Sequence, residues 1–143
     1  MGFWSAGDRV VGGYAALRMN RAILTVLLLC ASNVFMTFAW YFHLKMKGWT
    51  IPLAILVSWM IALPEYILQV PANRLGHVSH GGPFTAPQLK IIQEAITLTV
   101  FGLFSIYVLR ERLRGTDIAA FLLIMAGVTV GMLGRGQPAP VAP

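Results

Sequence analysis

Glu65 and Glu94 are the acidic residues of this 143-residue chain that lie inside long apolar runs. Glu65 interrupts a run of 26 residues between two basic residues, and Glu94 interrupts a similar run of 19. A carboxyl group is costly inside a membrane and is a candidate for binding a proton, a cation or a substrate. We expect both carboxyl groups about 6–8 Å below the same membrane surface, on neighbouring helices, where they could share a proton or a cation. Alternatively, each acid pairs with Arg74 or Lys90 and fastens a helix end.

Other polar or small residues recur around these acids at spacings that share one face of a helix. They are Ser58, Ala62, Glu65 and Gln69 in one run, Glu94, Thr97, Phe101 and Ser105 in another, and Asn33, Thr37 and either Trp40 or Tyr41 in the first run. The pattern predicts a lined interior, with Asn33, Gln69 and Trp40 as candidate path-lining residues. Alternatively, such side chains only bond one helix to another.

The remaining reactive side chains do not form a recognisable catalytic or metal-binding pattern. His77 and His80 lack a third ligand at the spacing of usual zinc sites, and His43 is most simply an interfacial residue. Cys30 is the only cysteine, so it cannot form an intrachain disulfide. We therefore expect no cofactor, no metal and no enzymatic activity.

The composition indicates a chain that spans a lipid bilayer. Hydrophobic residues make up 57% of the chain and charged residues 11%, whereas soluble domains carry about 25% charged residues. Four runs of 17 to 26 residues contain at most one charge each, and about 17–25 apolar residues span a bilayer as a helix. We predict an all-α, polytopic integral membrane protein. Its net charge of +6 would serve topology and lipid headgroups, with no nucleic acid as partner.

The transmembrane domain is expected to cover residues 21–134, with spans at about 22–43, 51–71, 87–109 and 116–133. Tight connections at 44–50 and 110–115 pair the spans into two antiparallel hairpins. Residues 1–20 form an N-terminal extension that could lie on the membrane surface, and Met19 is a candidate alternative translation start. Residues 135–143 form a flexible tail rich in Pro and Ala.

Local signals mark the ends of two spans. Thr85 and Gln88 have capping-box spacing at the start of the third span. Thr50 is a candidate N-cap of the second span, in which Pro64 should produce a kink. Pro71 is expected to help end that helix.

The basic residues are distributed almost equally between the two sides of the membrane, so they favour neither orientation strongly. The side that holds both termini carries six of them, and the opposite side carries five: Arg9, Arg18, Arg21, Arg74, Lys90 and Arg135 against Lys45, Lys47, Arg110, Arg112 and Arg114. Orientation follows the excess of Lys and Arg. The balance permits a cytoplasmic N-terminus or dual topology with inverted copies.

Four segments together resemble a small four-helix branch of the drug/metabolite transporter superfamily. They are residues 32–41, 58–76, 88–109 and 110–128, the last of which combines a Glu-Arg turn with a Gly-rich final helix. The branch is distantly similar to EamA and small multidrug resistance proteins. The resemblance implies a small integral membrane protein grouped with transporters, with no known substrate. Small multidrug resistance proteins form antiparallel dimers around a first-helix glutamate, whereas the first span here contains no acid and Asn33 is its deepest polar residue.

The resulting functional hypothesis is a small-molecule transporter that acts as a dimer, because four helices alone enclose little volume. Protons, if used, would be carried by Glu65 and Glu94. Gly127 and Gly131 stand four residues apart and could form the dimer face or pack within one chain. We expect the protein in a bacterial inner membrane. The alternative is a non-transporting accessory subunit of a larger membrane complex.

Overall fold

A computed structural model describes the backbone of residues 6–133 and the side chains of residues 13–133. The described chain forms four long helices: α1 (Ala6–Tyr41), α2 (Ile51–Gly76), α3 (Ala86–Phe104) and α4 (Gly115–Leu133). Each helical stretch is long and apolar enough to cross a membrane. The predicted all-α, four-span fold class is confirmed. The predicted tail, 135–143, lies outside the described residues.

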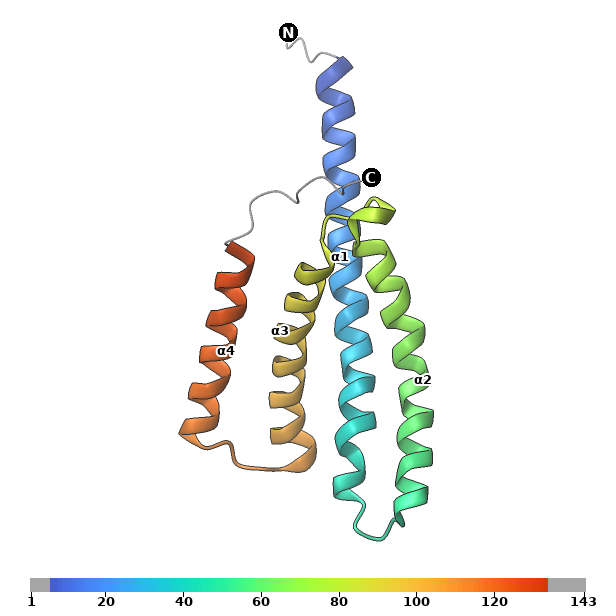
Figure 1. The fold of residues 1–143 in the computed structure, drawn as a ribbon, viewed down its shortest axis with the longest axis vertical. Helices are drawn as coiled ribbons and strands as arrows, with labels where there is room; N and C mark the ends of the chain where they lie inside the picture. Colours follow the sequence, from blue (N-terminus) through green and yellow to red (C-terminus); the bar gives the residue numbers. More distant parts are fainter. Residues whose placement is uncertain (1–5, 134–143) are drawn as a thin grey trace.

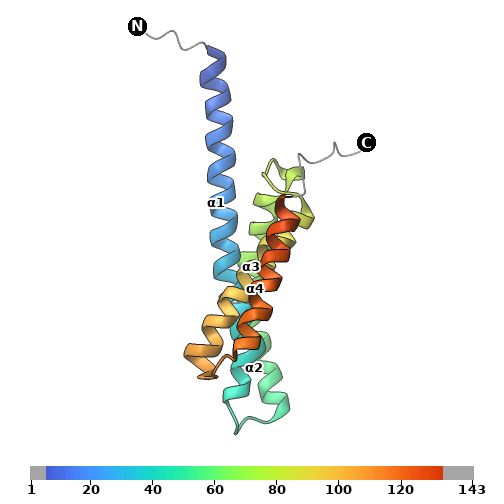
Figure 2. The same ribbon diagram turned by 90° about the vertical axis from the view of Figure 1, so that its left-hand side faces the viewer.

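The helices lie side by side in the spatial order α4, α3, α1, α2 (Figure 1). Helix α1 packs against both α2 and α3, and α4 packs against α3. Viewed from the side, the helices overlap as a single layer (Figure 2). The pairs α1/α2 and α3/α4 are the two antiparallel hairpins predicted from the short connections. Because α1 lies between α2 and α3, it is the helix around which the fold is organised.

Helix α1 is longer than the span predicted at residues 22–43. It begins at Ala6 and runs without interruption to Tyr41, where a short 3₁₀ turn, Phe42–Lys45, follows. Its N-terminal part projects beyond the α2–α3 connection (Figure 1). The part of the predicted extension 1–20 that the structure describes is therefore continuous with the first span.

Helix α2 contains Pro64, where a kink was predicted, and continues beyond Pro71, which was expected to help end it. It contains both Pro64 and Pro71 and ends at Gly76, five residues beyond Pro71. A proline removes one backbone hydrogen bond but leaves the following residues free to continue the helix. In membrane proteins, neighbouring helices and side chains can satisfy the freed carbonyl group. The extra turn brings the end of α2 into contact with the α2–α3 connection, where the Phe84 N–H donates a hydrogen bond to the Gly76 carbonyl at 2.9 Å.

The start of α3 follows the predicted capping box. The Thr85 hydroxyl oxygen accepts a hydrogen bond from the Gln88 backbone N–H at 3.4 Å, and Gln88 Oε1 accepts one from the Thr85 N–H at 2.8 Å. Two N–H groups at the helix start are thus satisfied locally. At its other end, α3 widens into a π-helical turn, Ser105–Leu109.

Three helices meet at Gly76, the last residue of α2. A Cβ atom at this position would lie 2.7 Å from Thr25 Cγ2 of α1 and 2.8 Å from Leu89 Cδ2 of α3. Thr25 is fully buried, and its hydroxyl oxygen has no hydrogen-bond partner in the described structure. The absence of a side chain at Gly76 therefore permits the close approach of α1 and α3 to the end of α2.

Replacing Gly76 by alanine is expected to lower the unfolding free energy by about 1–3 kcal/mol, because the added methyl overpacks this junction. Adding Thr25→Ala to the same chain should recover part of the loss, since it removes the clashing methyl and a hydroxyl without a partner. Thermal unfolding of the purified protein in detergent measures both effects. The control is Gly13→Ala on α1, where a Cβ meets nothing within 4 Å. Equal stability of the Gly76 and Gly13 variants would contradict the prediction.

Candidate functional site

The central helix α1 carries a row of buried polar side chains. Ser32 and Asn33 are fully buried, and Thr37 is 3% exposed. They lie well inside the apolar stretch of α1, where an unpaired polar group is costly. Partners for these groups can come from α2 on one side, from α3 on the other, and from the backbone of α1 itself: the Ser32 hydroxyl lies 3.2 Å from the Leu29 carbonyl oxygen.

Helix α3 supplies the partner of Asn33. The Thr97 hydroxyl donates a hydrogen bond to Asn33 Oδ1 at 2.6 Å, and the Asn33 amide donates to the Leu29 carbonyl at 2.8 Å. The Thr97 hydroxyl also lies 2.8 Å from the carbonyl of Gln93, within its own helix. Both sides of the Asn33 amide are therefore bonded, and the bond to Thr97 joins α1 to α3.

Helix α2 supplies the partner of Ser32. The Ser32 hydroxyl lies 2.8 Å from Gln69 Oε1 and donates to it. Glu65 lies one turn earlier on α2 and is only 6% exposed. Glu65 and Gln69 thus lie on the stripe of α2 that packs on α1, which places two of the predicted site residues beside the buried polar row.

The structure does not bring Glu65 and Glu94 together. Helix α1 lies between the helices that carry them (Figure 1), and Glu65 stands eleven residues before the end of α2 at Gly76. At the rise of an α-helix this is about 16 Å from the helix end, which is farther from that end than the sequence suggested. Glu94 is 46% exposed, and its carboxylate lies 2.5 Å from the Lys90 ammonium. Glu94 therefore adopts the surface pairing with Lys90 that was the alternative prediction.

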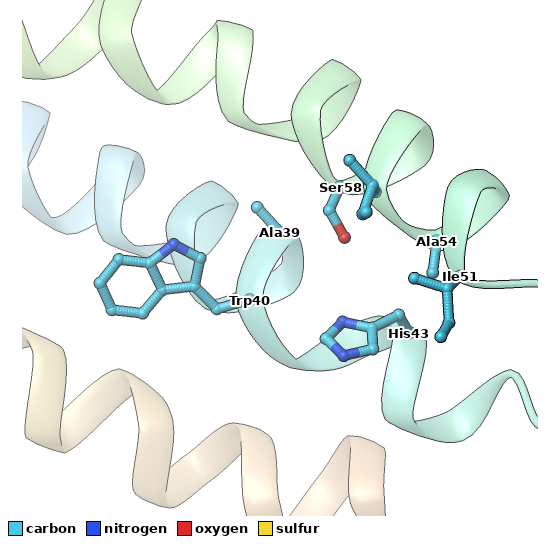
Figure 3. Close-up of a pocket in the computed structure, with 7 residues that line it drawn as sticks. Ala39, Trp40, His43, Ile51, Ala54 and Ser58 are labelled. Carbon is cyan, nitrogen blue, oxygen red and sulfur yellow. The ribbon is translucent and has the colours of Figure 1, made fainter.

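Trp40 lies apart from the Asn33–Gln69 region, in a groove between the ends of α1 and α2 (Figure 3). The groove holds about 450 Å³ and is lined by Ala39, Trp40, His43, Ile51, Ala54, Ile55 and Ser58. Trp40 is 57% exposed. His43 Nδ1 is buried without a hydrogen-bond partner in the described structure, a feature that the sequence alone did not single out.

A known protein family matches most of the chain. A family model described as "Putative member of DMT superfamily (DUF486)" matches residues 25–132. The chain belongs to the DUF486 family. No curated protein and no solved structure matched it. The resemblance to the drug/metabolite transporter superfamily is confirmed, and that superfamily comprises transporters rather than enzymes.

The DUF486 match extends over α4, which contains the two predicted dimer-face glycines. A Cβ at Gly131 would lie 3.2 Å from Ile91 Cδ1 of α3, whereas a Cβ at Gly127 would meet nothing within 4 Å. Gly131 therefore lies against α3 of the same chain, and Gly127 lies on an open surface. None of the residues from Gly115 to Leu133 is buried.

A double-mutant cycle can measure the bond that joins α1 and α3 in this DUF486 chain. Asn33→Leu and Thr97→Val should show a coupling of about 0.6 kcal/mol and no more than about 1.7 kcal/mol, the average and the maximum found for hydrogen bonds between membrane helices. Unfolding in mixed detergent micelles is the measurement. Thr99→Val is the control, because the Thr99 hydroxyl bonds only the Ala95 carbonyl of its own helix, at 2.9 Å. Strict additivity of the Asn33 and Thr97 changes would contradict the bond.

Proposed function

We propose that the protein is a secondary transporter of a small molecule in the bacterial inner membrane, acting as a dimer. Its superfamily supports transport as the activity. The observation that carries the proposal is the buried polar region of the central helix, where Ser32 and Asn33 bond to Gln69 and Thr97 of the two neighbouring helices. Polar groups at this depth in a membrane protein commonly mark substrate or ion pathways.

Each candidate residue takes a role from its position. Glu65 is buried next to Gln69 on the face of α2 that meets α1, so it is the group proposed to bind a proton or the substrate. Asn33 and Gln69 are proposed to line the path, and Trp40, which lies in the groove between the ends of α1 and α2, is proposed to lie at its entrance. Glu94 is half-exposed beside Lys90, which suits a role in attracting charged substrates or protons rather than carrying them across.

The single-layer arrangement supports a dimer. A row of four helices leaves both of its faces open (Figure 2), so one chain has no second wall with which to enclose a substrate. Helix α4 has no buried residue, and Gly127 on its surface leaves room for close approach of another helix. A second copy would provide the missing wall.

Reconstitution in liposomes tests the proposal. Proton-driven currents would be recorded on solid-supported membranes with a probe panel of amino acids, sugars and the lipophilic cation tetraphenylphosphonium. We expect a protein-dependent current for at least one probe class, and light scattering of the purified protein should give the mass of two chains. Currents equal to those of protein-free vesicles across the panel, with folded protein, would contradict transport.

One observation that supports the dimeric transporter also supports the alternative function, that of a non-transporting accessory subunit. The absence of buried residues from Gly115 to Leu133 also fits a helix covered by a larger membrane complex. Purification under mild detergent distinguishes the two. A stoichiometric complex with other membrane proteins, combined with an absence of flux, would favour the accessory role.

A further inference from the structure

Basic side chains gather where the α2–α3 connection crosses α1. Two adjacent cavities, of about 500 and 380 Å³, share Arg21 of α1 and His80 of the connection as lining residues. Arg74 in the last turn of α2 lines the larger cavity, and Arg18 of α1 lines the smaller one. Among the side chains of residues 13–133, no acidic one lines either cavity, so the described side chains form a positively charged site.

Arg21 is held in place by the connection itself. Its Nη1 donates a hydrogen bond of 2.6 Å to the His80 carbonyl. The next residue, Gly81, has a left-handed backbone with φ of 76°, and a Cβ there would lie 3.1 Å from the same Nη1. A guanidinium carries five N–H donors, so this bond orients Arg21 and leaves other donors for an anion. Arg18 and Arg74 are both exposed.

The same cavities have apolar walls. Val70, Pro71 and Leu75 of α2 line the larger one, and Tyr14 and Leu17 of α1 line the smaller one. Val70 is 50% exposed and Leu17 is 62% exposed. Basic groups thus lie next to exposed apolar surface at the end of a membrane-spanning helix, which is the boundary that phospholipid headgroups occupy.

We propose that these cavities bind the phosphodiester headgroup of an anionic phospholipid. Guanidinium groups match phosphate geometry with paired N–H donors, and the acyl chain would lie along Val70, Pro71 and Leu75. A soluble phosphate ester offers the same anion but leaves the apolar wall uncovered, which favours the lipid. The site shares no lining residue with the Glu65–Gln69 region, so the proposal does not rest on transport.

Native mass spectrometry of the full chain tests the site by counting bound lipids as phosphatidylglycerol is titrated. Arg18→Gln together with Arg74→Gln should weaken binding about 25-fold, at about fivefold for each basic residue near a lipid surface. Both side chains are exposed, so the variant should fold. The control is Lys45→Gln with Lys47→Gln, the same change in charge at exposed positions at the opposite end of α1, and it should bind within about twofold of the unmodified protein.

Two further ligands test whether binding requires an anionic headgroup and whether a free phosphate ion can replace the lipid. Phosphatidylcholine, which has no net charge, should bind at least about fivefold more weakly than phosphatidylglycerol. Inorganic phosphate at millimolar concentration should not displace the bound lipid. Equal binding of the two lipids, equal losses in the Arg and Lys variants, or displacement by inorganic phosphate would each overturn the proposal.

Discussion

Glu65→Gln is expected to abolish proton-driven flux in liposomes. Glutamine keeps the size and most of the hydrogen-bonding capacity of the side chain. An amide, however, cannot take up and release a proton near neutral pH. Glu65 is 6% exposed and lies on the stripe of α2 that packs on the central helix. The packing around it should tolerate the exchange, so circular dichroism and unfolding should remain close to those of the unmodified protein.

Glu94→Gln is the matched control, because it makes the same chemical change at a half-exposed carboxylate paired with Lys90. An exposed pair four residues apart on a helix contributes only about 0.3–0.5 kcal/mol to stability, so the variant should fold. It should also retain most of its flux, because Glu94 pairs with Lys90 and not with the buried polar row of α1. Unchanged flux in the Glu65 variant would contradict its assignment as the proton site. If the Glu94 variant lost flux and the Glu65 variant did not, the proton site would be assigned to Glu94, near Lys90 on α3.

Much of the fold could be predicted from the sequence because a bilayer imposes few choices on long apolar runs. Four runs of spanning length and two short connections predicted four helices in two antiparallel hairpins, and Thr85 with Gln88 predicted the start of α3. The order of packing was not predictable. Lipid tails are as apolar as leucine side chains, so an apolar stripe does not reveal which helix covers it. The position of α1 between α2 and α3 therefore emerged only from the structure.

The end of α2 was also difficult to predict, because it too depends on contacts with neighbouring helices. Pro71 is a strong breaker signal in water, but α2 continues to Gly76, since a neighbouring helix or side chain can satisfy the carbonyl that proline leaves free. This extension changes the interpretation of Glu65. A carboxyl that the sequence placed near the membrane surface lies close to the middle of its helix.

The polar residues of the site were predictable as faces but not as pairs. Helical spacing grouped Asn33 with Thr37, and Gln69 with Glu65, because a face depends only on the period of the helix. The bonds of Asn33 to Thr97 and of Gln69 to Ser32 depend on the rotation of one helix against another, which spacing does not specify. The same limit applies to Glu65 and Glu94, whose equal predicted depth did not make them neighbours.

Gly82→Ala is expected to be the most destabilising of the substitutions considered, with a loss of more than about 3 kcal/mol. A Cβ at Gly82 would lie 2.3 Å from both the carbonyl carbon and the carbonyl oxygen of Gly76, and 2.4 Å from the Leu75 carbonyl oxygen. These are backbone atoms at the end of a helix, so they cannot move aside as the tip of a flexible side chain can.

Relief of this clash would require the α2–α3 connection to lift from the end of α2. The connection is held there by hydrogen bonds from the Phe84 N–H to the Gly76 carbonyl at 2.9 Å and from the Gly82 N–H to the His77 carbonyl at 3.0 Å. Each lost bond costs about 1 kcal/mol, in addition to the overpacking. Because the connection leads directly into α3, its displacement should also weaken the contact between α3 and α1.

Unfolding in mixed detergent micelles measures the loss, and Gly48→Ala in the α1–α2 connection is the control. A Cβ at Gly48 meets nothing within 4 Å, so that variant should remain within about 0.5 kcal/mol of the unmodified protein. The Gly82 variant should also weaken the Asn33–Thr97 coupling, because this coupling depends on the position of α3 against α1. Stability equal to that of the Gly48 variant would mean that the connection does not pack on Gly76, and the placement of α3 against the central helix would then need another cause.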